Sequence, residues 1–235
     1  MKKTVGILGG MGPMATADLF QKIVAHTAAD QDGGHIRVYI DSNASIPDRT
    51  AAILSGGEDP VPAMADSLGK LEACGADCII MPCNTAHYFL PRLEPLTKLP
   101  FLSMIRVAAQ ACRERFPGRT AAILATTGTL AAGLYQGALT AEGVSFLEPD
   151  EGERTALMEI IYQGVKASAP PERYRAPFLS VIERLTGRGA ECFLLACTEL
   201  PLAVRELGVD LPAVDPTEEL AKAAVRFCGY GLRGG

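Results

Sequence analysis

The sequence predicts an α/β protein of two pseudo-symmetric domains, each a parallel sheet flanked by helices. Three observations carry this prediction. Apolar runs of strand length alternate with helical patterns, the alternation restarts near residue 120, and one stretch of sequence occurs twice, at residues 71–85 and 185–199. The Leu, Gly and Ala positions and two Cys positions coincide in the two copies. Strands separated by helices of this length form parallel sheets through right-handed crossovers.

The first half opens with a β-branched apolar run at residues 4–8, which predicts a strand that ends in a glycine loop at residues 9–13. Pro and Gly punctuate residues 42–62, which predicts a long loop with one helical turn after Asp48. Helical or strand-like apolar spacing predicts the other elements. These are helices at 15–28, 63–74, 86–96 and 105–116, and strands at 36–40, 78–81 and 101–103.

The second half repeats this order. An apolar strand at 120–125 precedes the sequence Thr-Thr-Gly-Thr at residues 126–129, where the first half has its glycine loop. The elements that follow are strands at 144–147, 192–196 and 213–214, and helices at 130–140, 153–166, 176–186, 200–207 and 217–228.

Three pairs of landmarks fix the correspondence between the halves: the first strands, the cysteines that end the repeated stretches, and two Leu-Pro turns lie 116, 114 and 112 residues apart. We expect one domain to comprise residues 1–103 with about 213–235, and the other residues 104–212. Ligands of open parallel sheets bind beyond the carboxyl ends of the strands. The active site is therefore expected in the cleft between the domains.

Composition limits the classes of function. With 48% apolar and 21% charged residues the chain can bury a large core. A net charge of −5 argues against a nucleic-acid partner or an anionic membrane surface. No apolar stretch has the length of a membrane helix. Seven cysteines, an odd number placed in apolar runs, favour a reducing, cytoplasmic location.

Cys83 and Cys197 each end a repeated stretch and precede a predicted helix start. Backbone N–H groups and the helix dipole at such a position lower the pKa of a thiol, which can then act as base or nucleophile. The other cysteines are expected in the core; they are Cys74, Cys78, Cys112, Cys192 and Cys228. Their spacings lack the C-x2-C turn of structural zinc, so no metal site is expected. His87 could contact Cys83, although a surface position is the stronger expectation.

Two further motifs suggest ligand contacts. Gly10-x-Gly12-x-x-Ala15 fits a dinucleotide fingerprint, but the carboxylate that should accompany it, at Asp41, comes too late in the sequence, so no cofactor is expected. The hydroxyls of residues 126–129 suit a small carboxylate, and they could equally cap the next helix. Arg49, on the long loop, suits a carboxylate. Lys166 lies at a predicted helix end, and both cations could also be solvated surface charges.

Five motifs in order resemble the aspartate/glutamate racemases that need no pyridoxal phosphate, and the aspartate branch in particular. They are Gly-Gly-Met-Gly-Pro at 9–13, Ile-Pro-Asp-Arg-Thr at 46–50, Met-Pro-Cys-Asn-Thr-Ala-His at 81–87, Ala-Thr-Thr-Gly-Thr at 125–129 and Ala-Cys-Thr-Glu at 196–199. The resemblance implies proton transfer at Cα, an acidic amino-acid substrate and a homodimer. It makes Cys83 and Cys197 the two acid/bases. The substrate-binding residues that it implies are Met11, Arg49, Asn84, Thr85, Thr126, Thr129, Lys166 and Thr198.

The chain departs from the related glutamate racemases at two places. Their Asp-Ser after the first strand is Gly-Met-Gly here, and Glu199 stands where they have a His. Those residues assist the thiols there, so the resemblance leaves open what deprotonates the cysteines here. Hydantoin racemases, broad-specificity amino-acid racemases and maleate isomerases remain alternatives, as does a non-catalytic binding relative. Two cysteines disfavour a related one-cysteine decarboxylase.

Overall fold

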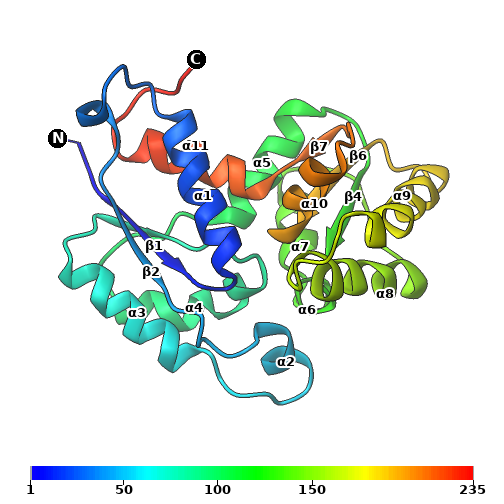
Figure 1. Cartoon of the computed structure of the whole chain (residues 1–235), viewed down its shortest axis with the longest axis horizontal. Coiled ribbons are helices and arrows are strands. Elements are labelled where there is room, and N and C mark those ends of the chain that lie inside the picture. The colour runs from blue at the N-terminus through cyan, green and yellow to red at the C-terminus, as the bar shows by residue number, and fades with distance from the viewer. Residues whose placement is uncertain (1, 235) are drawn as a thin grey trace. The chain divides into compact units, whose positions relative to one another are not determined.

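A computed structural model describes residues 2–234 of the chain. The chain divides into two compact units, unit 1 being Met1–Val107 with Thr217–Gly235 and unit 2 being Ala108–Pro216. Each contains one parallel sheet flanked by helices, which confirms the predicted fold class (Figure 1). Within residues 2–234, no helix is both long enough and apolar enough to cross a membrane.

The sheet of unit 1 has the order β2-β1-β3, with strands β1 (Val5–Gly9), β2 (Val38–Ser42) and β3 (Cys78–Ile80). The central strand β1 is buried along its whole length and pairs in parallel with both neighbours. Continuous burial explains why its sequence is apolar throughout instead of alternating.

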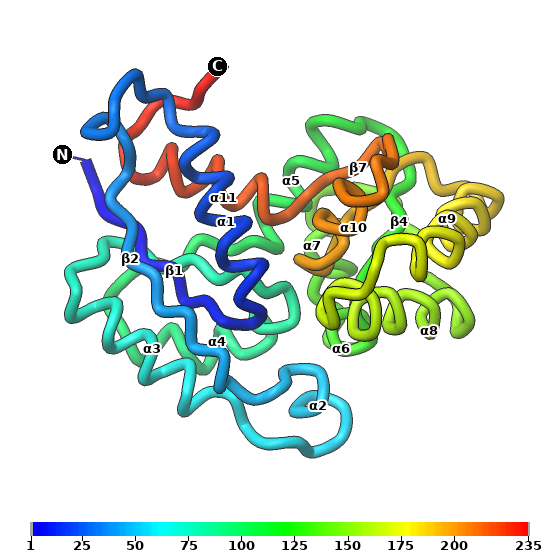
Figure 2. The backbone as a smooth tube through the Cα atoms, viewed as in Figure 1, coloured from blue at the N-terminus to red at the C-terminus, as the bar shows by residue number. Residues whose placement is uncertain are grey.

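Helices cover both faces of this sheet. One core cluster packs β1 and β3 against α3 (Val61–Ala73), and the other packs them against α1 (Pro13–His26) and α11 (Pro216–Phe227). The last residues of the chain run beside the end of α1, where the Ala28 N–H donates to the Gly231 carbonyl at 2.9 Å (Figure 2). The helix α5 (Met104–Arg115) crosses from unit 1 into unit 2.

Two expected elements of unit 1 are wrong. The predicted helix at 86–96 is three short pieces, η2 (Thr85–Phe89), α4 (Leu90–Leu93) and η3 (Glu94–Leu96). Prolines start the second and third pieces, because a proline inside a helix removes a hydrogen bond and clashes with the preceding turn. The predicted strand at 101–103 is a single bridge between Ile79 and Phe101, because the chain enters α5 directly afterwards. Unit 1 also contains η1 (Asp32–Gly34) and α2 (Arg49–Leu54), which is the expected turn after Asp48.

Unit 2 has the sheet order β5-β4-β6-β7. Its strands are β4 (Ala121–Ala125), β5 (Phe146–Leu147), β6 (Cys192–Ala196) and β7 (Ala213–Val214), and its helices are α6 (Thr127–Ala131), α7 (Leu134–Ala141), α8 (Glu151–Glu159), α9 (Glu172–Gly187) and α10 (Glu199–Leu207). Two predicted helices are interrupted. Gly133, at φ 64°, separates α6 from α7, and α8 continues at Ile160 into a π-helix, η4 (Ile160–Val165).

The repeated stretches make the same local structure in the two units. In each, a glycine with positive φ follows a helix, Gly75 at 89° and Gly189 at 100°. The acidic residue two positions later donates its N–H to the threonine that precedes the central strand, and its carboxylate accepts the N–H of that threonine. These contacts are 2.8 and 2.7 Å between Asp77 and Thr4, and 2.9 and 3.0 Å between Glu191 and Thr120. The shared Gly and acidic positions therefore attach the strand before each cysteine to the central strand.

Substitution of the glycine tests this account. Gly189→Ala is expected to lower the free energy of unfolding by about 1–2 kcal/mol, because a Cβ disfavours the left-handed backbone. Gly187→Ala is the matched control, two residues earlier at the helical end of α9, where an added Cβ meets open space. It is expected to leave stability unchanged or to raise it by up to about 1 kcal/mol. Urea unfolding followed by circular dichroism measures both, and equal losses would contradict the role of the turn.

Candidate active site

Cys83 lies three residues beyond β3, in a loop that is buried throughout. Its side chain is 6% exposed, and Asn84 and Thr85 beside it are also buried. The helix expected after Cys83 is η2, a five-residue 3-10 segment. The dipole of so short a segment is small, so the expected helix-dipole effect on Cys83 loses most of its basis.

His87 is buried, and the expectation of a surface position is wrong. Its Nδ1 lies 2.9 Å from the carbonyl oxygen of Cys83, and its Nε2 accepts the N–H of Met104 at 3.2 Å. Burial lowers the pKa of His87 to about 4, although its hydrogen bonds to the backbone at Cys83 and Asn84 oppose this shift. The imidazole is therefore neutral, with its proton on Nδ1. It holds the cysteine loop against the start of α5 through the backbone and does not contact the thiol.

The glycine loop after β1 brings Met11 to Arg49. The guanidinium of Arg49 donates to the carbonyl of Met11 at 3.3 Å, and to the carbonyls of Ile46 and Pro47 at 3.0 and 2.9 Å. Arg49 is only 8% exposed, so it fastens the loop after β2 to the loop after β1. Met11 also belongs to the same core cluster as Cys83. Unit 1 therefore places the predicted residues in neighbouring loops and at the starts of the short helices α2 and η2; they are Met11, Arg49, Cys83, Asn84 and Thr85.

The glycines of this loop have a packing role. A Cβ on Gly9 would lie 2.5 Å from the side chain of Thr16, and one on Gly10 would lie 2.2 Å from the backbone of Asn43. The Gly10 N–H donates to the hydroxyl of Thr16 at 2.9 Å. Close contact between the loop and its own chain thus explains the first glycine of the dinucleotide-like pattern, Gly10.

In unit 2 the corresponding loop follows β4. Thr126 is the N-cap of α6, and its hydroxyl accepts the N–H of Thr129 at 3.2 Å and donates to the Thr129 hydroxyl at 3.1 Å. Both side chains are buried. Thr126 therefore caps the helix, as one of the two interpretations of this motif expects.

Cys197 follows β6 directly and is 7% exposed. Its Sγ lies 2.9 Å from Oε2 of Glu199, which also accepts the hydroxyl of Thr198 at 3.1 Å. Burial, and then the charge of Glu199, raise the pKa of the Cys197 thiol well above its ordinary value, while Lys166 acts in the opposite direction. The expected lowering of this pKa is wrong, because burial and a neighbouring carboxylate outweigh a helix N-terminus.

Lys166 ends the π-helix η4, and its Nζ lies 4.3 Å from the centre of the Tyr162 ring. The side chain is exposed, yet its positive charge acts to lower the pKa of the Cys197 thiol. Unit 2 therefore gathers Thr126, Thr129, Lys166, Cys197 and Thr198, together with Glu199. Sequence reasoning did not include Glu199 among the site residues. The available signal was an acidic residue in the first turn of the helix that follows a rim cysteine.

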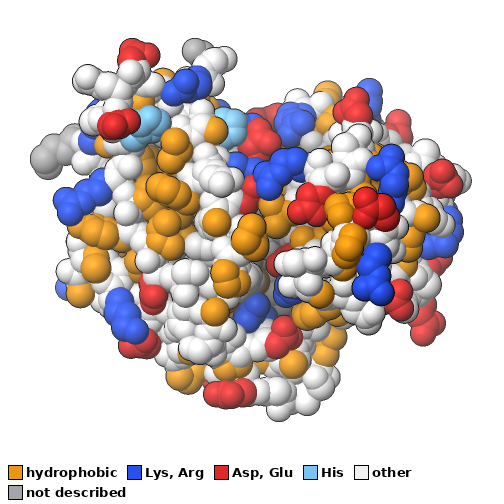
Figure 3. Space-filling view, in the orientation of Figure 1, with side chains coloured by type: hydrophobic (Ala, Val, Ile, Leu, Met, Phe, Trp, Pro, Cys, Tyr) orange, Lys and Arg blue, Asp and Glu red, His pale blue; other side chains and the backbone are white. Residues whose placement is uncertain are grey.

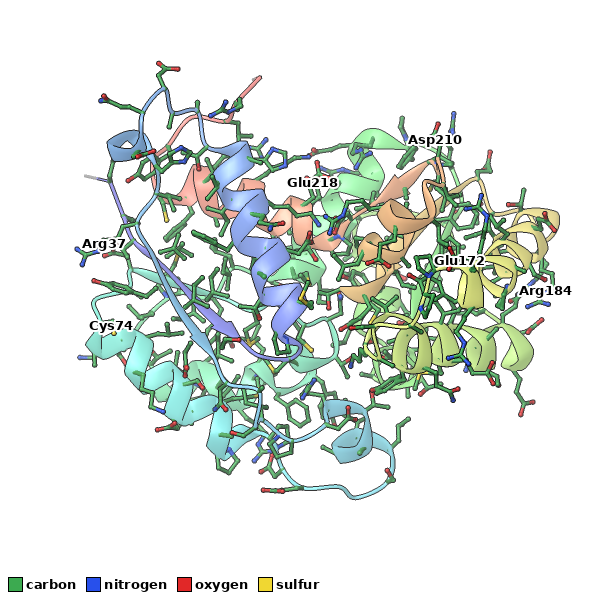
Figure 4. All side chains as sticks on the ribbon, viewed as in Figure 1. Arg37, Cys74, Glu172, Arg184, Asp210 and Glu218 are labelled. Atoms are coloured by element: carbon green, nitrogen blue, oxygen red, sulfur yellow. The ribbon has the colours of Figure 1, made fainter. Side chains whose placement is uncertain are left out.

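The other five cysteines were all expected in the core, and one of them is not. Cys78, Cys112, Cys192 and Cys228 are buried, but Cys74 is exposed after the end of α3, where Figure 4 labels it. It is the C-cap residue of α3. Among residues 2–234, no group of three or more His, Cys, Asp or Glu side chains is placed to hold a metal ion.

Comparisons with known proteins identify the class. A family model described as Asp/Glu/Hydantoin racemase matches residues 8–224. The broad specificity amino-acid racemase of Bacillus subtilis is 25% identical and aligns over 94% of this chain and 96% of its own length. Among solved structures, Picrophilus torridus aspartate racemase is 32% identical, with a TM-score of 0.84 over 98% of this chain and 96% of that one.

More distant structures share the fold. An aspartate racemase homologue from Pyrococcus horikoshii is 23% identical, with a TM-score of 0.76 over 96% of this chain and 99% of that one. Glutamate racemase from Francisella tularensis is 16% identical, with a TM-score of 0.67 over 96% and 81% of the two chains. The fold and the family match define an isomerase, a cofactor-independent racemase. The chain belongs to the Asp/Glu/hydantoin racemase family.

The neutral state of His87 predicts a specific pH dependence of stability. The folded pKa of about 4 lies below the ordinary value of 6.5, so the unfolded chain binds a proton that the folded chain does not. The stability from this group is complete above pH 6.5 and falls by about 3 kcal/mol as the pH drops towards 4. His87→Asn keeps a donor for the Cys83 carbonyl and cannot titrate. Unfolding by urea at several pH values between 7 and 4 should show a smaller loss for the variant; equal slopes would contradict the assignment.

Proposed function

We propose that the protein racemises aspartate by two-base proton transfer at Cα, with Cys83 and Cys197 as the two acid/bases. The observation that carries the proposal is the repeated placement of a buried thiol just beyond a strand that pairs with the central strand of its sheet, once in each unit. The proposal requires the two units to bring these thiols to opposite faces of one substrate carbon. The 32% sequence identity to Picrophilus torridus aspartate racemase, over 98% of this chain, supports aspartate as substrate.

The chemistry needs a base and an acid of the same kind. A Cα–H is very weakly acidic, so charge that develops on the carbon must be stabilised by donors fixed in a dry site. We assign this role to Asn84 and Thr85 in unit 1 and to Thr126, Thr129 and Thr198 in unit 2. These side chains are all buried, as such donors must be. One cysteine accepts the Cα proton as thiolate while the other delivers its proton to the opposite face as thiol.

Loss of either cysteine tests the mechanism. Cys83→Ala and Cys197→Ala are each expected to lower racemisation of aspartate by more than about 100-fold, because each removes one of the two proton carriers. Circular dichroism measures inversion, and deuterium incorporation at Cα in heavy water measures proton exchange. Near-native inversion in either variant would refute the two-base assignment. If the native protein showed no inversion and no exchange, a binding protein would be favoured instead.

We further propose that Arg49 and Lys166 recognise the side-chain carboxylate of the substrate. Lys166 gives the clearer test, because its side chain is exposed, whereas Arg49 holds three loop carbonyls and its loss would disturb the fold. Lys166→Leu is expected to raise KM for aspartate by about tenfold or more, which corresponds to loss of one charge-assisted contact, and to change KM for alanine little. Steady-state kinetics with both substrates measures this split, and equal changes would refute the role.

A broad-specificity amino-acid racemase is the second candidate function. The curated Bacillus relative bears that description and aligns over nearly the whole chain. Rates with aspartate, glutamate, alanine and a hydantoin under the same conditions decide between the two. Comparable rates with acidic and apolar amino acids would contradict the aspartate proposal and favour broad specificity.

We also propose a cytoplasmic location, because all seven cysteines are free thiols, which is typical of a reducing compartment.

We propose that the protein forms a homodimer through the face of unit 1 that α1 and β2 form. Large apolar side chains are exposed there on α1 and the edge strand β2 (Figure 3). They are Met14 at 68%, Phe20 at 39%, Val24 at 39% and Ile40 at 42% exposure. Light scattering coupled to size-exclusion chromatography should give the mass of a dimer, and Phe20→Glu should shift it towards the monomer. A monomeric native protein would contradict the proposal, and so would a Phe20→Glu variant that keeps the native mass.

A further inference from the structure

The contact between Cys197 and Glu199 lies at a turn of the backbone and is supported by a hydrogen bond from Thr198. The Leu200 N–H donates to the Cys197 carbonyl at 3.0 Å, which closes a turn over residues 197–200. The Cys197 Sγ and Glu199 Oε2 atoms are 2.9 Å apart, and both residues are buried. The Thr198 hydroxyl donates to the same carboxylate oxygen at 3.1 Å, which holds Glu199 in this position.

Electrostatics then limits the protonation of the pair. Burial and the Glu199 charge raise the pKa of the Cys197 thiol. A thiolate and a carboxylate at this distance in a buried site repel each other strongly, in the way that two neighbouring carboxylates do. The pair therefore keeps at least one proton. Two further titratable groups interact with Cys197, namely Lys166, which favours the thiolate, and Tyr135, whose pKa burial raises, so that it remains neutral.

We propose that Glu199 is a positioning residue that shares one proton with the Cys197 thiol during the reaction. This inference rests on the proposed two-base function and answers how Cys197 becomes a thiolate. The S–H proton moves to Glu199 Oε2, which leaves a thiolate beside a neutral carboxylic acid. The thiolate takes the Cα proton, and the Cys83 thiol gives its proton to the opposite face of the carbon. The site starts and ends with two protons: one on the pair and one on Cys83 before the step, and both on the pair after it.

The same residue marks a difference between the two units. In the repeated stretches, Glu199 corresponds to Thr85, which follows Cys83 by two residues. A hydroxyl at this position cannot accept a proton as a carboxylate does. The two cysteines are therefore not equivalent, and in a reaction that needs a single base, loss of Glu199 is expected to matter only when Cys197 is that base.

Racemisation itself hides this difference. The equilibrium constant between enantiomers is 1, so kcat/KM has the same value in both directions for the native protein and for every variant. Elimination from 3-chloroaspartate avoids this constraint, since it needs only one base. The Cα proton passes to the thiolate, the C–Cl electron pair leaves as chloride, and water hydrolyses the enamine to a 2-oxo acid and ammonia. Each Cα configuration presents its proton to one cysteine, and Cys83→Ala and Cys197→Ala identify which.

The experiment compares chloride release from both Cα enantiomers of 3-chloroaspartate. Glu199→Gln is expected to slow the Cys197-dependent elimination at neutral pH on the order of 10- to 100-fold, and to change the Cys83-dependent elimination less than about threefold. The loss should shrink as pH rises, because the thiol then loses its proton to solvent. Glu199→Asp keeps a carboxylate and should recover part of the rate. Glu183→Gln, at an exposed position of α9, is the control and should match the native protein.

The outcomes separate the two proposals. Equal losses with both enantiomers, or no loss, would overturn the role of Glu199 and leave the two-base function standing. If Glu199→Gln does not fold, Glu199→Asp carries the test, since its shorter reach should still slow only the Cys197-dependent enantiomer. A native protein that neither eliminates chloride nor exchanges the Cα proton would overturn the proposed function and this inference with it.

Discussion

Parallel pairing of one strand with its central neighbour is the constraint on which the rest of each unit depends. β3 pairs with β1, and β6 pairs with β4, so the cysteine that follows each strand lies at the same sheet edge as the loop that follows the central strand. Met11 and Thr126 occupy those central loops. The acidic residue just before β3 or β6, Asp77 or Glu191, supports this pairing through two hydrogen bonds to the threonine just before the central strand. A shift of register would move each thiol away from the loop beside it.

The sequence was sufficient for the elements that local chemistry determines. The repeat located the strands before Cys83 and Cys197, and these positions follow from apolar runs and glycine turns. It was insufficient where burial decides the outcome. The spacing of His87 from Cys83 allowed a contact with the thiol and favoured a surface position, but the ring is buried and a backbone donor on α5, distant in sequence, holds it. The pKa of Cys197 could not be predicted either, because burial acts against the helix N-terminus by an amount that only packing sets.

The surroundings of the two cysteines also show how one family pattern can hold different chemistry in the two units. In unit 1 a neutral imidazole is bonded to the carbonyl of the cysteine, and an arginine binds the carbonyls of two neighbouring loops. Unit 2 places a carboxylate against its cysteine and a lysine charge within reach. The repeat thus preserves the positions of the thiols, while the residues that follow them have diverged. A description of the proposed site by its two cysteines alone would miss this asymmetry.

The contribution of α11 to unit 1 has a consequence for synthesis of the chain. Leu220, Ala224 and Val225 complete the core cluster that β1 and α1 begin near the N-terminus. Unit 2 is continuous in sequence, and all of it has been made before these residues are. During translation the first hundred residues therefore hold an unfinished apolar surface while the second unit already has its full sequence. Unit 1 is therefore begun first and completed last, and its unfinished core is the kind of apolar surface that chaperones protect.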